Sequence, residues 1–149
     1  CKEVSFFYKV FCKLRPGIPV MVLHGNMKQM KRMAVFLHFS QSPAALCFAT
    51  DVAARGLDIV GVDWVVQFDC PDDAETYIHR VGRTARFESG GNGVLFLEPS
   101  EVAMVKVLHS KKVPVQVVEM NTNKEQTITP RIQSLLAQKK DLQEDAKKM

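Results

Sequence analysis

Three arginines recur at every third position in the segment His79–Arg86 (HRVGRTAR). Along a helical path, side chains three residues apart lie on one face, so Arg80, Arg83 and Arg86 would share a surface. A guanidinium group binds phosphate oxygens through paired hydrogen bonds, and a cluster of cations without an opposing anion is unfavourable. The spacing therefore indicates a phosphate site, with a solvent-facing charged helix as the alternative. Gly82 argues against that alternative, because glycine weakens an exposed helix and adds no contact.

The segment Ala49–Asp58 (ATDVAARGLD) combines small residues with a few polar groups. Its alanines and Gly56 allow the backbone to approach a bulky partner closely. Thr50 supplies a hydroxyl and amide donors at an expected helix start, where phosphates bind readily. Asp58 is an acceptor of the kind that holds sugar hydroxyls. These residues indicate a nucleotide or nucleic-acid contact, and a structural turn capped by Asp58 is the alternative.

A third segment, His24–Arg32 (HGNMKQMKR), follows a short apolar run and is rich in basic residues. A strand end followed by the basic start of a helix suits the sugar-phosphate backbone of a nucleic acid. Met27, Met30 and the neighbouring Met33 are expected to pack in the core, because methionine readily fills irregular gaps there.

The elements that must position these residues follow from the pattern of apolar residues. Continuous apolar runs of strand length alternate with segments of helical period. This pattern indicates an α/β fold with a parallel, doubly wound sheet, whose ligands bind beyond the carboxyl ends of the strands. The expected strands are 19–23, 44–49, 64–68, 94–97 and 113–120, and the expected helices are 4–14, 27–39, 72–81, one opened by Pro99–Ser100 and one opened by Thr129–Pro130.

Local signals refine three of these elements. Ser100 is expected to cap its helix, and Thr129 with Pro130 forms an expected N-cap and first-residue pair. Pro114 moves the strand 113–120 towards a sheet edge, because proline cannot donate a ladder hydrogen bond. The residues from Gln138 onwards are polar enough to form a linker or the start of a further segment.

The composition is that of an ordinary globular domain. The chain has 149 residues, of which 46% are hydrophobic and 24% charged, and this length fits one domain. No apolar run approaches the ~18 residues of a membrane span, and charged residues interrupt the first apolar stretch, so neither a membrane helix nor a signal peptide is expected. The four cysteines lack metal-ligand spacing, which favours a reducing intracellular compartment and predicts no metal site.

The net charge of +4 is unevenly distributed. Residues 1–40 carry seven basic side chains and one acidic one, whereas the remainder sums to −2. Such a block suggests a polyanionic partner, with a solvated helix face as the alternative. The arginines suit a triphosphate, but the sequence contains no G-x-x-x-x-G-K-[ST] loop, which would bind the phosphates through its backbone amides. We therefore expect half of a nucleotide site, on a piece of a longer protein.

Together these segments resemble the second RecA-like domain of the DEAD-box RNA helicases. The segment 49–59 (ATDVAARGLDI) resembles the family's motif V, and 79–86 resembles its motif VI. The segment 24–32 is similar to the family's HGxxxQxxR sequence, and residues 1–3 to the end of motif IV. The resemblance implies a RecA-like helicase C-terminal domain over 1–120 that lacks its first strand, followed by a helical extension over 121–149.

The resemblance also implies a role for each matching residue. It implies that Arg83 and Arg86 contact the γ-phosphate of ATP, with Arg86 as the arginine finger. It also implies that Gly56 and Asp58 contact the ATP ribose. The residues implied to contact the RNA backbone are Gly25, Gln29, Arg32 and Thr50. Those implied to couple the ATP site to the RNA site are Asp51, His79 and Arg80. Ala85 departs from the family, which usually has glycine there.

The cofactor implied by the family is ATP with Mg²⁺, the metal being held mainly by an N-terminal RecA-like domain that is not part of this chain. The isolated chain is therefore expected to be inactive. Its implied partners are that N-terminal domain and RNA, bound through the backbone without sequence preference; no membrane contact is expected.

Two further segments, 67–86 (QFDCPDDAETYIHRVGRTAR) and 127–138 (TITPRIQSLLAQ), resemble the subgroup that acts in nucleolar assembly of the small ribosomal subunit. This resemblance implies remodelling of pre-ribosomal RNA, a location in the nucleus and nucleolus, and pre-ribosomal assembly proteins as partners. Two alternatives compete with an RNA helicase. One is a DNA helicase or translocase of the same superfamily, and the other is a catalytically idle RNA-binding or protein-docking module of the same fold.

Overall fold

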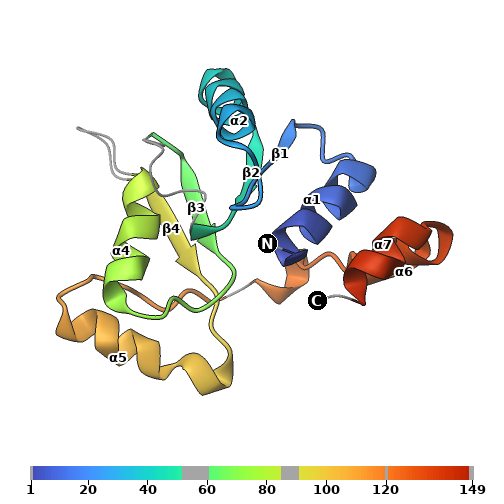
Figure 1. The fold of residues 1–149 in the computed structure, drawn as a ribbon. Coiled ribbons are helices and arrows are strands. Elements are labelled where there is room, and N and C mark those ends of the chain that lie inside the picture. The colour runs from blue at the N-terminus through green and yellow to red at the C-terminus, as the bar shows by residue number, and fades with distance from the viewer. Residues whose placement is uncertain (1, 52–60, 85–90, 120, 148–149) are drawn as a thin grey trace. The chain divides into compact units, whose positions relative to one another are not determined.

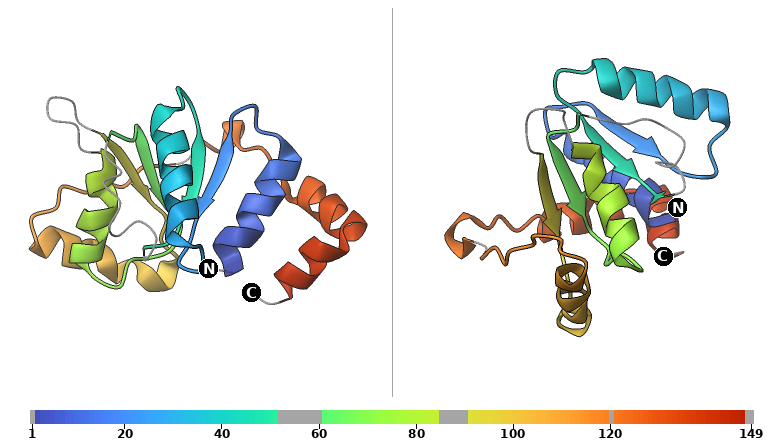
Figure 2. Two further views of the ribbon diagram at one scale, coloured as in Figure 1. Left: turned by 45° about the horizontal axis from the view of Figure 1, so that its top comes forward. Right: turned by 90° about the vertical axis from the view of Figure 1, so that its left-hand side faces the viewer.

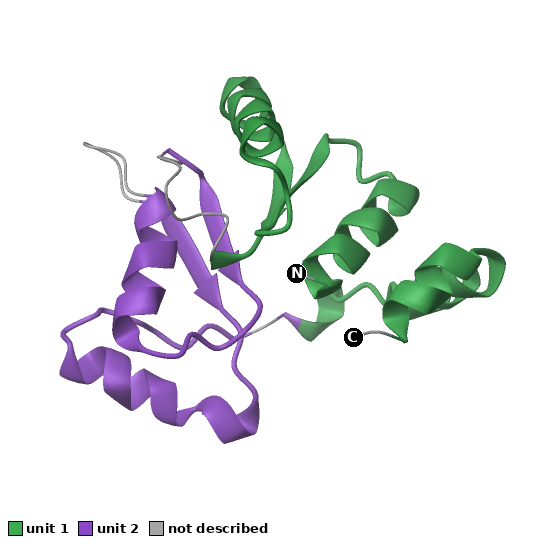
Figure 3. Cartoon of the chain, in the orientation of Figure 1, with its two compact units in different colours: residues 1–58, 122–149 green, residues 59–121 purple. Residues whose placement is uncertain are grey.

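The computed structural model describes residues 2–51, 61–84, 91–119 and 121–147, and the chain forms two compact units (Figure 3). Unit 1 comprises residues 1–58 and 122–149, and unit 2 comprises residues 59–121. In each unit two strands pair in parallel and helices pack beside them, so the expected parallel α/β arrangement is confirmed. Within the described ranges, no helix is long and apolar enough to cross a membrane.

Unit 1 contains a two-stranded parallel sheet and most of the helices. In chain order its elements are α1 (Lys2–Leu14), β1 (Val20–Leu23), α2 (Gln29–Gln41), β2 (Leu46–Ala49), η3 (Thr122–Lys124), α6 (Thr129–Gln138) and α7 (Lys140–Ala146) (Figure 1). The first four elements lie within about two residues of the ranges expected from sequence. The two strands pair from Val20 with Leu46 to Leu23 with Ala49.

The core of unit 1 is organised around α1, which lies beside α6 and α7 (Figure 2). Phe6 and Val10, four residues apart on α1, are buried together with Leu142 of α7. The aromatic rings of α1 also reach the sheet, since Phe11 meets Phe48 of β2 edge-on with ring centroids 5.1 Å apart. Helix α1 therefore contacts the sheet and the C-terminal helices at once.

The polar C-terminal residues form a helix rather than the linker expected from Gln138 onwards. Helix α7 begins at Lys140, and the side chain of Leu142 is completely buried. Lys9 of α1 donates a hydrogen bond to the Asp145 carboxylate, and this bond raises the pKa of Lys9. The linker prediction was wrong because the polarity of the segment concealed one apolar anchor, whose burial against α1 stabilises the helix.

Unit 2 pairs its strands in the same parallel sense. Its elements are β3 (Trp64–Gln67), α4 (Ala74–Val81), η1 (Gly82–Thr84), β4 (Asn92–Leu95), η2 (Pro99–Glu101) and α5 (Ala103–Ser110). Ala74 and Tyr77 of α4 and Leu108 of α5 form its buried core. Gly93 allows β4 to lie close to α4, since a Cβ there would come within 2.6 Å of a Val81 methyl carbon.

Two helix starts differ from the sequence prediction. The cap before α5 is Glu98, whose amide donates to the Glu101 carboxylate at 2.9 Å, and Ser100 lies inside η2. In α6 the N-cap position is Ile128, so Thr129 is already helical. A glutamate pair can satisfy the first amides reciprocally, and this capping box displaces the serine.

No strand forms over the described residues of 113–120, so that prediction was wrong. The amide of Val113 donates to the Leu108 carbonyl at 3.0 Å, which folds the segment back on α5. Val113 and Val115 pack against the core of unit 2, whereas Val117 and Val118 are 88% and 83% exposed. Pro114 has no amide hydrogen, so the segment follows side-chain packing instead of a ladder of hydrogen bonds.

The packing of α7 on α1 can be tested by truncating its anchor. We expect Leu142→Ala to lower the free energy of unfolding of the chain by about 2–5 kcal/mol, because it leaves a cavity against α1. The exposed neighbour Glu144 provides a control, and Glu144→Ala should change stability by less than about 0.5 kcal/mol. Urea unfolding followed by circular dichroism measures both. Equal stabilities for the two variants would show that α7 does not pack on α1.

Candidate functional site

The carboxyl ends of β1 and β2 lie at one edge of the unit 1 sheet. The Thr50 amide donates to the Leu23 carbonyl at 3.1 Å, continuing the parallel ladder by one residue beyond β2. His24 follows β1 directly, and its carbonyl accepts from the Met27 amide at 3.1 Å in the turn that leads to α2. The structure therefore brings His24, Gly25 and Thr50, from two separate sequence segments, to the same edge.

Within the part of the chain that the structure describes, two side chains at this edge have buried polar atoms without a hydrogen-bond partner. These atoms are Nδ1 of His24 and Oγ1 of Thr50. Burial lowers the pKa of His24, and nearby positive charges, Lys31 among them, lower it further, which favours the neutral imidazole. Because most buried polar atoms in proteins are hydrogen-bonded, an unsatisfied pair at a strand end points to a ligand that supplies the missing partners.

Helix α2, which contacts β1, carries a cation in its first turn. Arg32 is half-buried, and its Nη1 donates to Oε1 of Gln29 at 3.2 Å. No side chain caps the start of α2 at Lys28. The Gln29 contact restricts the Arg32 side chain, which reduces the entropy lost when the guanidinium binds an anion.

In unit 2, Arg80 is hydrogen-bonded to the carboxyl end of β3. Its Nη1 donates to the Asp69 carbonyl at 3.0 Å and to Oε1 of Gln67 at 3.5 Å. Gln67 is only 3% exposed. Because a buried side chain has little conformational freedom, Gln67 fixes the orientation of the Arg80 guanidinium.

Arg83 follows the end of α4 and lies in the short turn η1. Its Nε donates to the His79 carbonyl at 3.3 Å, and its own carbonyl accepts from Val62 at 3.2 Å. The α-helix that carries Arg80 ends at Val81, and Arg83 lies in the tighter turn that begins at Gly82. Each guanidinium is held by a different backbone carbonyl.

The remaining sequence-predicted residues lie in several places. Asp51 follows Thr50 and is half-buried, and His79 is exposed on α4. Gly56, Asp58, Ala85 and Arg86 lie outside the described residues. His24 lies in the segment 24–32, which is expected to contact a nucleic acid, but neither His24 nor Gln67 has an individual role predicted from sequence. His24 directly follows β1 and Gln67 is the last residue of β3, positions at which strand-end ligand contacts occur.

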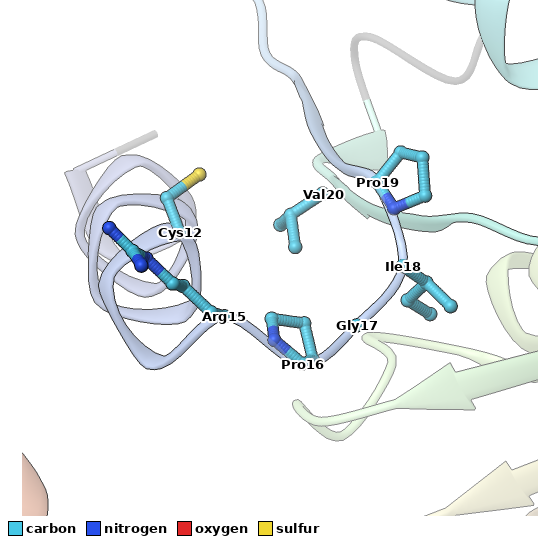
Figure 4. Close-up of a pocket in the computed structure, with 7 residues that line it drawn as sticks. All are labelled: Cys12, Arg15, Pro16, Gly17, Ile18, Pro19 and Val20. Atoms are coloured by element: carbon cyan, nitrogen blue, oxygen red, sulfur yellow. The ribbon is translucent and has the colours of Figure 1, made fainter.

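Two surface pockets of unit 1 contain none of these residues. The first, of about 420 Å³, surrounds the turn between α1 and β1 and is lined by Cys12, Arg15 and residues 16–20 (Figure 4). The second, of about 360 Å³, lies between α1 and α6. Among the residues that the structure describes, no three His, Cys, Asp or Glu side chains are placed to bind a metal ion.

Comparison with known proteins identifies the family of the chain. The family model described as the helicase conserved C-terminal domain matches residues 1–88. The human "Probable ATP-dependent RNA helicase DDX10" is 53% identical over 99% of this chain, and the Aspergillus fumigatus "ATP-dependent RNA helicase dbp4" is 54% identical over 90% of it. The chain spans only 17% of the length of each of these relatives.

Solved structures show the same fold. Domain 2 of the DEAD-box helicase Mss116p, bound to an RNA duplex, is 29% identical to this chain with a TM-score of 0.69, covering 91% of this chain and 59% of that one. A second structure of Mss116p, bound to ssRNA and AMP-PNP, has a TM-score of 0.68, 29% identity and coverage of 91% and 30%.

Cysteine reactivity tests the described position of β2. Burial raises the pKa of the Cys47 thiol to about 12, whereas Cys12 on α1 is exposed. At pH 8 only about one Cys47 side chain in 10⁴ would be a thiolate, the form that reacts. Iodoacetamide labelling with peptide mass spectrometry should therefore modify Cys12 at least about a hundredfold faster than Cys47. Comparable rates in the folded chain would contradict the burial of the Cys47 thiol.

Proposed function

This chain belongs to the helicase conserved C-terminal domain family, as the second RecA-like domain of a DEAD-box RNA helicase, and on that basis we propose that it completes the RNA site and the ATP site of an RNA-dependent ATPase. The full-length protein would unwind short RNA duplexes, closing on RNA when ATP binds and releasing it after hydrolysis. The observation that carries the proposal is the edge of the β1–β2 sheet, where buried atoms of His24 and Thr50 have no hydrogen-bond partner among the described residues.

An RNA backbone has the chemistry to satisfy this edge. Phosphate oxygens accept from the Thr50 hydroxyl, and a ribose hydroxyl can pair with the neutral imidazole of His24. Arg32, supported by Gln29, adds the cation that a phosphate requires, and Gly25 allows the backbone of the sugar-phosphate chain to approach. None of these groups reads a base edge, so binding should depend on salt and not on base sequence.

The arginines of unit 2 suit the phosphates of ATP. The Nε of Arg83 donates to the His79 carbonyl, and this bond restricts the orientation of the planar guanidinium. By the family resemblance, Arg86 supplies a second guanidinium. ATP, when bound, supplies the γ-phosphoryl group that is transferred to water. Arg83 and Arg86 would stabilise its developing charge, and Gly56 with Asp58 would hold the ribose. Mg²⁺ would be held mainly by the N-terminal RecA-like domain.

The network around Arg80 would communicate between the two sites. Arg80 is attached to the carboxyl end of β3 through Asp69 and the buried Gln67, so a displacement of the strand end would move the guanidinium. Asp51 and His79 would contribute contacts with the N-terminal domain. In this proposal residues 1–120 form the RecA-like domain and residues 121–149 form its helical extension.

RNA-stimulated ATPase activity of a full-length protein that carries this chain tests the proposal. We expect Arg83→Ala/Arg86→Ala to lower turnover by about 10³-fold or more while RNA affinity is retained, because the charge of the transition state loses its counter-charges. Arg131→Ala, at an exposed arginine of α6, is the matched control and should leave turnover unchanged. Wild-type turnover that survives in the double variant would remove both arginines from the site.

The same assay separates the RNA site from the ATP site. Thr50→Val keeps the shape of the side chain and removes its hydroxyl, so it should raise the RNA concentration needed for half-maximal stimulation without lowering turnover at saturating RNA. A wild-type protein with no ATPase activity, with or without RNA, would favour the catalytically idle module. Stimulation by DNA as strong as that by RNA would favour the DNA translocase.

We further propose that the RNA is pre-ribosomal and that the protein acts in the nucleolus with pre-ribosomal assembly proteins. The support is the resemblance of segments 67–86 and 127–138 to the ribosome-assembly subgroup, together with 53–54% identity to the two relatives above. Ultraviolet cross-linking of the tagged full-length protein in cells should enrich pre-ribosomal RNA over messenger RNA. Enrichment of messenger RNA alone, with nucleoplasmic fluorescence, would contradict this assignment.

A further inference from the structure

Helix α2 carries apolar side chains on the face that points away from its sheet. It contacts β1, and Arg32, Val35, Phe36 and Phe39, which share the other side of the helix, are all half-buried. Met30 is 84% exposed, Met33 42% and Leu37 47%, and Ala34 is exposed as well. The expectation that Met30 and Met33 pack in the core was therefore wrong, because the register of the helix turns them outwards.

These four residues form a continuous stripe, which we call the α2 stripe. Met30, Met33, Ala34 and Leu37 follow the spacing i, i+3, i+4, i+7, so they lie along one side of two successive turns. A solvent-facing helix surface is ordinarily polar, and glutamate, glutamine or lysine would form the helix about as well. Helix formation therefore does not explain the stripe. Apolar anchors at this spacing are how one amphipathic helix recognises another.

The basic residues beside the α2 stripe indicate the charge of the partner that would bind there. Within its 13 residues α2 contains no Asp or Glu, and Lys28 precedes it. Lys31 and His38, seven residues apart, lie along one border of the stripe, and both are exposed. A second copy of α2 would bring no carboxylate to this border. A partner helix with acidic side chains beside its apolar seam would complement both features.

We propose that the α2 stripe is a docking site for an acidic amphipathic helix of a partner protein. Met30 and Leu37 are its anchors, with Met33 and Ala34 between them. Methionine is unbranched and adaptable, which suits a surface that must fit side chains of another helix. Lys31 pairs with a carboxylate of the partner and sets its orientation. The stripe differs from the RNA site in chemistry, since aliphatic side chains provide nothing that binds phosphate.

Two designed helical peptides test the chemistry of this site on the full-length protein. Both carry leucines at i, i+3, i+4 and i+7, and they differ only in having glutamates or lysines beside the leucines. By fluorescence anisotropy we expect the glutamate peptide to bind about tenfold or more tightly than the lysine peptide. Met30→Ser/Leu37→Ser should weaken its binding by about tenfold or more. Val102→Ser/Val107→Ser, at two exposed valines of the α5 region, should not.

A charge reversal and an RNA titration complete the experiment. Lys31→Glu should reduce or invert the preference for the glutamate peptide. Met30→Ser/Leu37→Ser should leave single-stranded RNA affinity and RNA-stimulated turnover unchanged, so the docking proposal can fail while the helicase proposal stands. Equal binding of both peptides, or equal loss in both serine pairs, would overturn the docking site. Loss of RNA affinity in Met30→Ser/Leu37→Ser would assign the stripe to the RNA site instead.

Photo-cross-linking shows what occupies the site in cells. A benzophenone side chain at position 37 of the full-length protein should cross-link to a helical segment with an apolar seam and net negative charge, in a different protein. The same group at position 107 should not label that segment. Cross-links only to the protein itself, to a second copy or to RNA, or no cross-link at position 37, would overturn the proposal.

Discussion

The parallel ladder between β1 and β2 is the interaction on which the candidate RNA site depends. Pairing Leu23 with Ala49 sets the two strand ends level, and the bond from the Thr50 amide to the Leu23 carbonyl extends that register to Thr50. Parallel strands end at the same edge, so residues 24–25 and 50–51 meet there although they are about 26 positions apart in sequence. A register shifted by one residue would turn Thr50 to the other face of the sheet.

The position of that ladder depends in turn on α1. Through Phe7 and Phe11 the helix packs against Phe48 of β2, and through Phe6 and Val10 it packs against the C-terminal helices. Helices α6 and α7 therefore contribute to the core that supports the sheet. Unit 2 uses a different device, because buried Gln67 and the Asp69 carbonyl orient Arg80 at the end of β3. In both units the polar side chains of interest are placed by strand ends.

Sequence patterns predicted four of the five proposed strands, because short runs such as 20–23 and 46–49 are apolar enough to be buried. They failed where packing by a single residue decided the outcome. The segment from Gln138 onwards is mostly polar, yet the side chain of Leu142 is completely buried and the residues around it form a helix. The run 113–119 reads as a strand, yet Val113 and Val115 gain more by packing on α5 than Pro114 allows in a ladder.

The sequence by itself determined the family, the alternation of strands and helices, and the residue types at the strand ends. These features are local, since apolar period, glycine and proline positions and motif spacing act over a few residues. Only the tertiary structure decided which polar atoms of His24 and Thr50 lack partners in the described ranges, which carbonyls accept from Arg80 and Arg83, and that Met30 and Leu37 face outwards. Those outcomes depend on register and on contacts between residues distant in sequence, which no local pattern records.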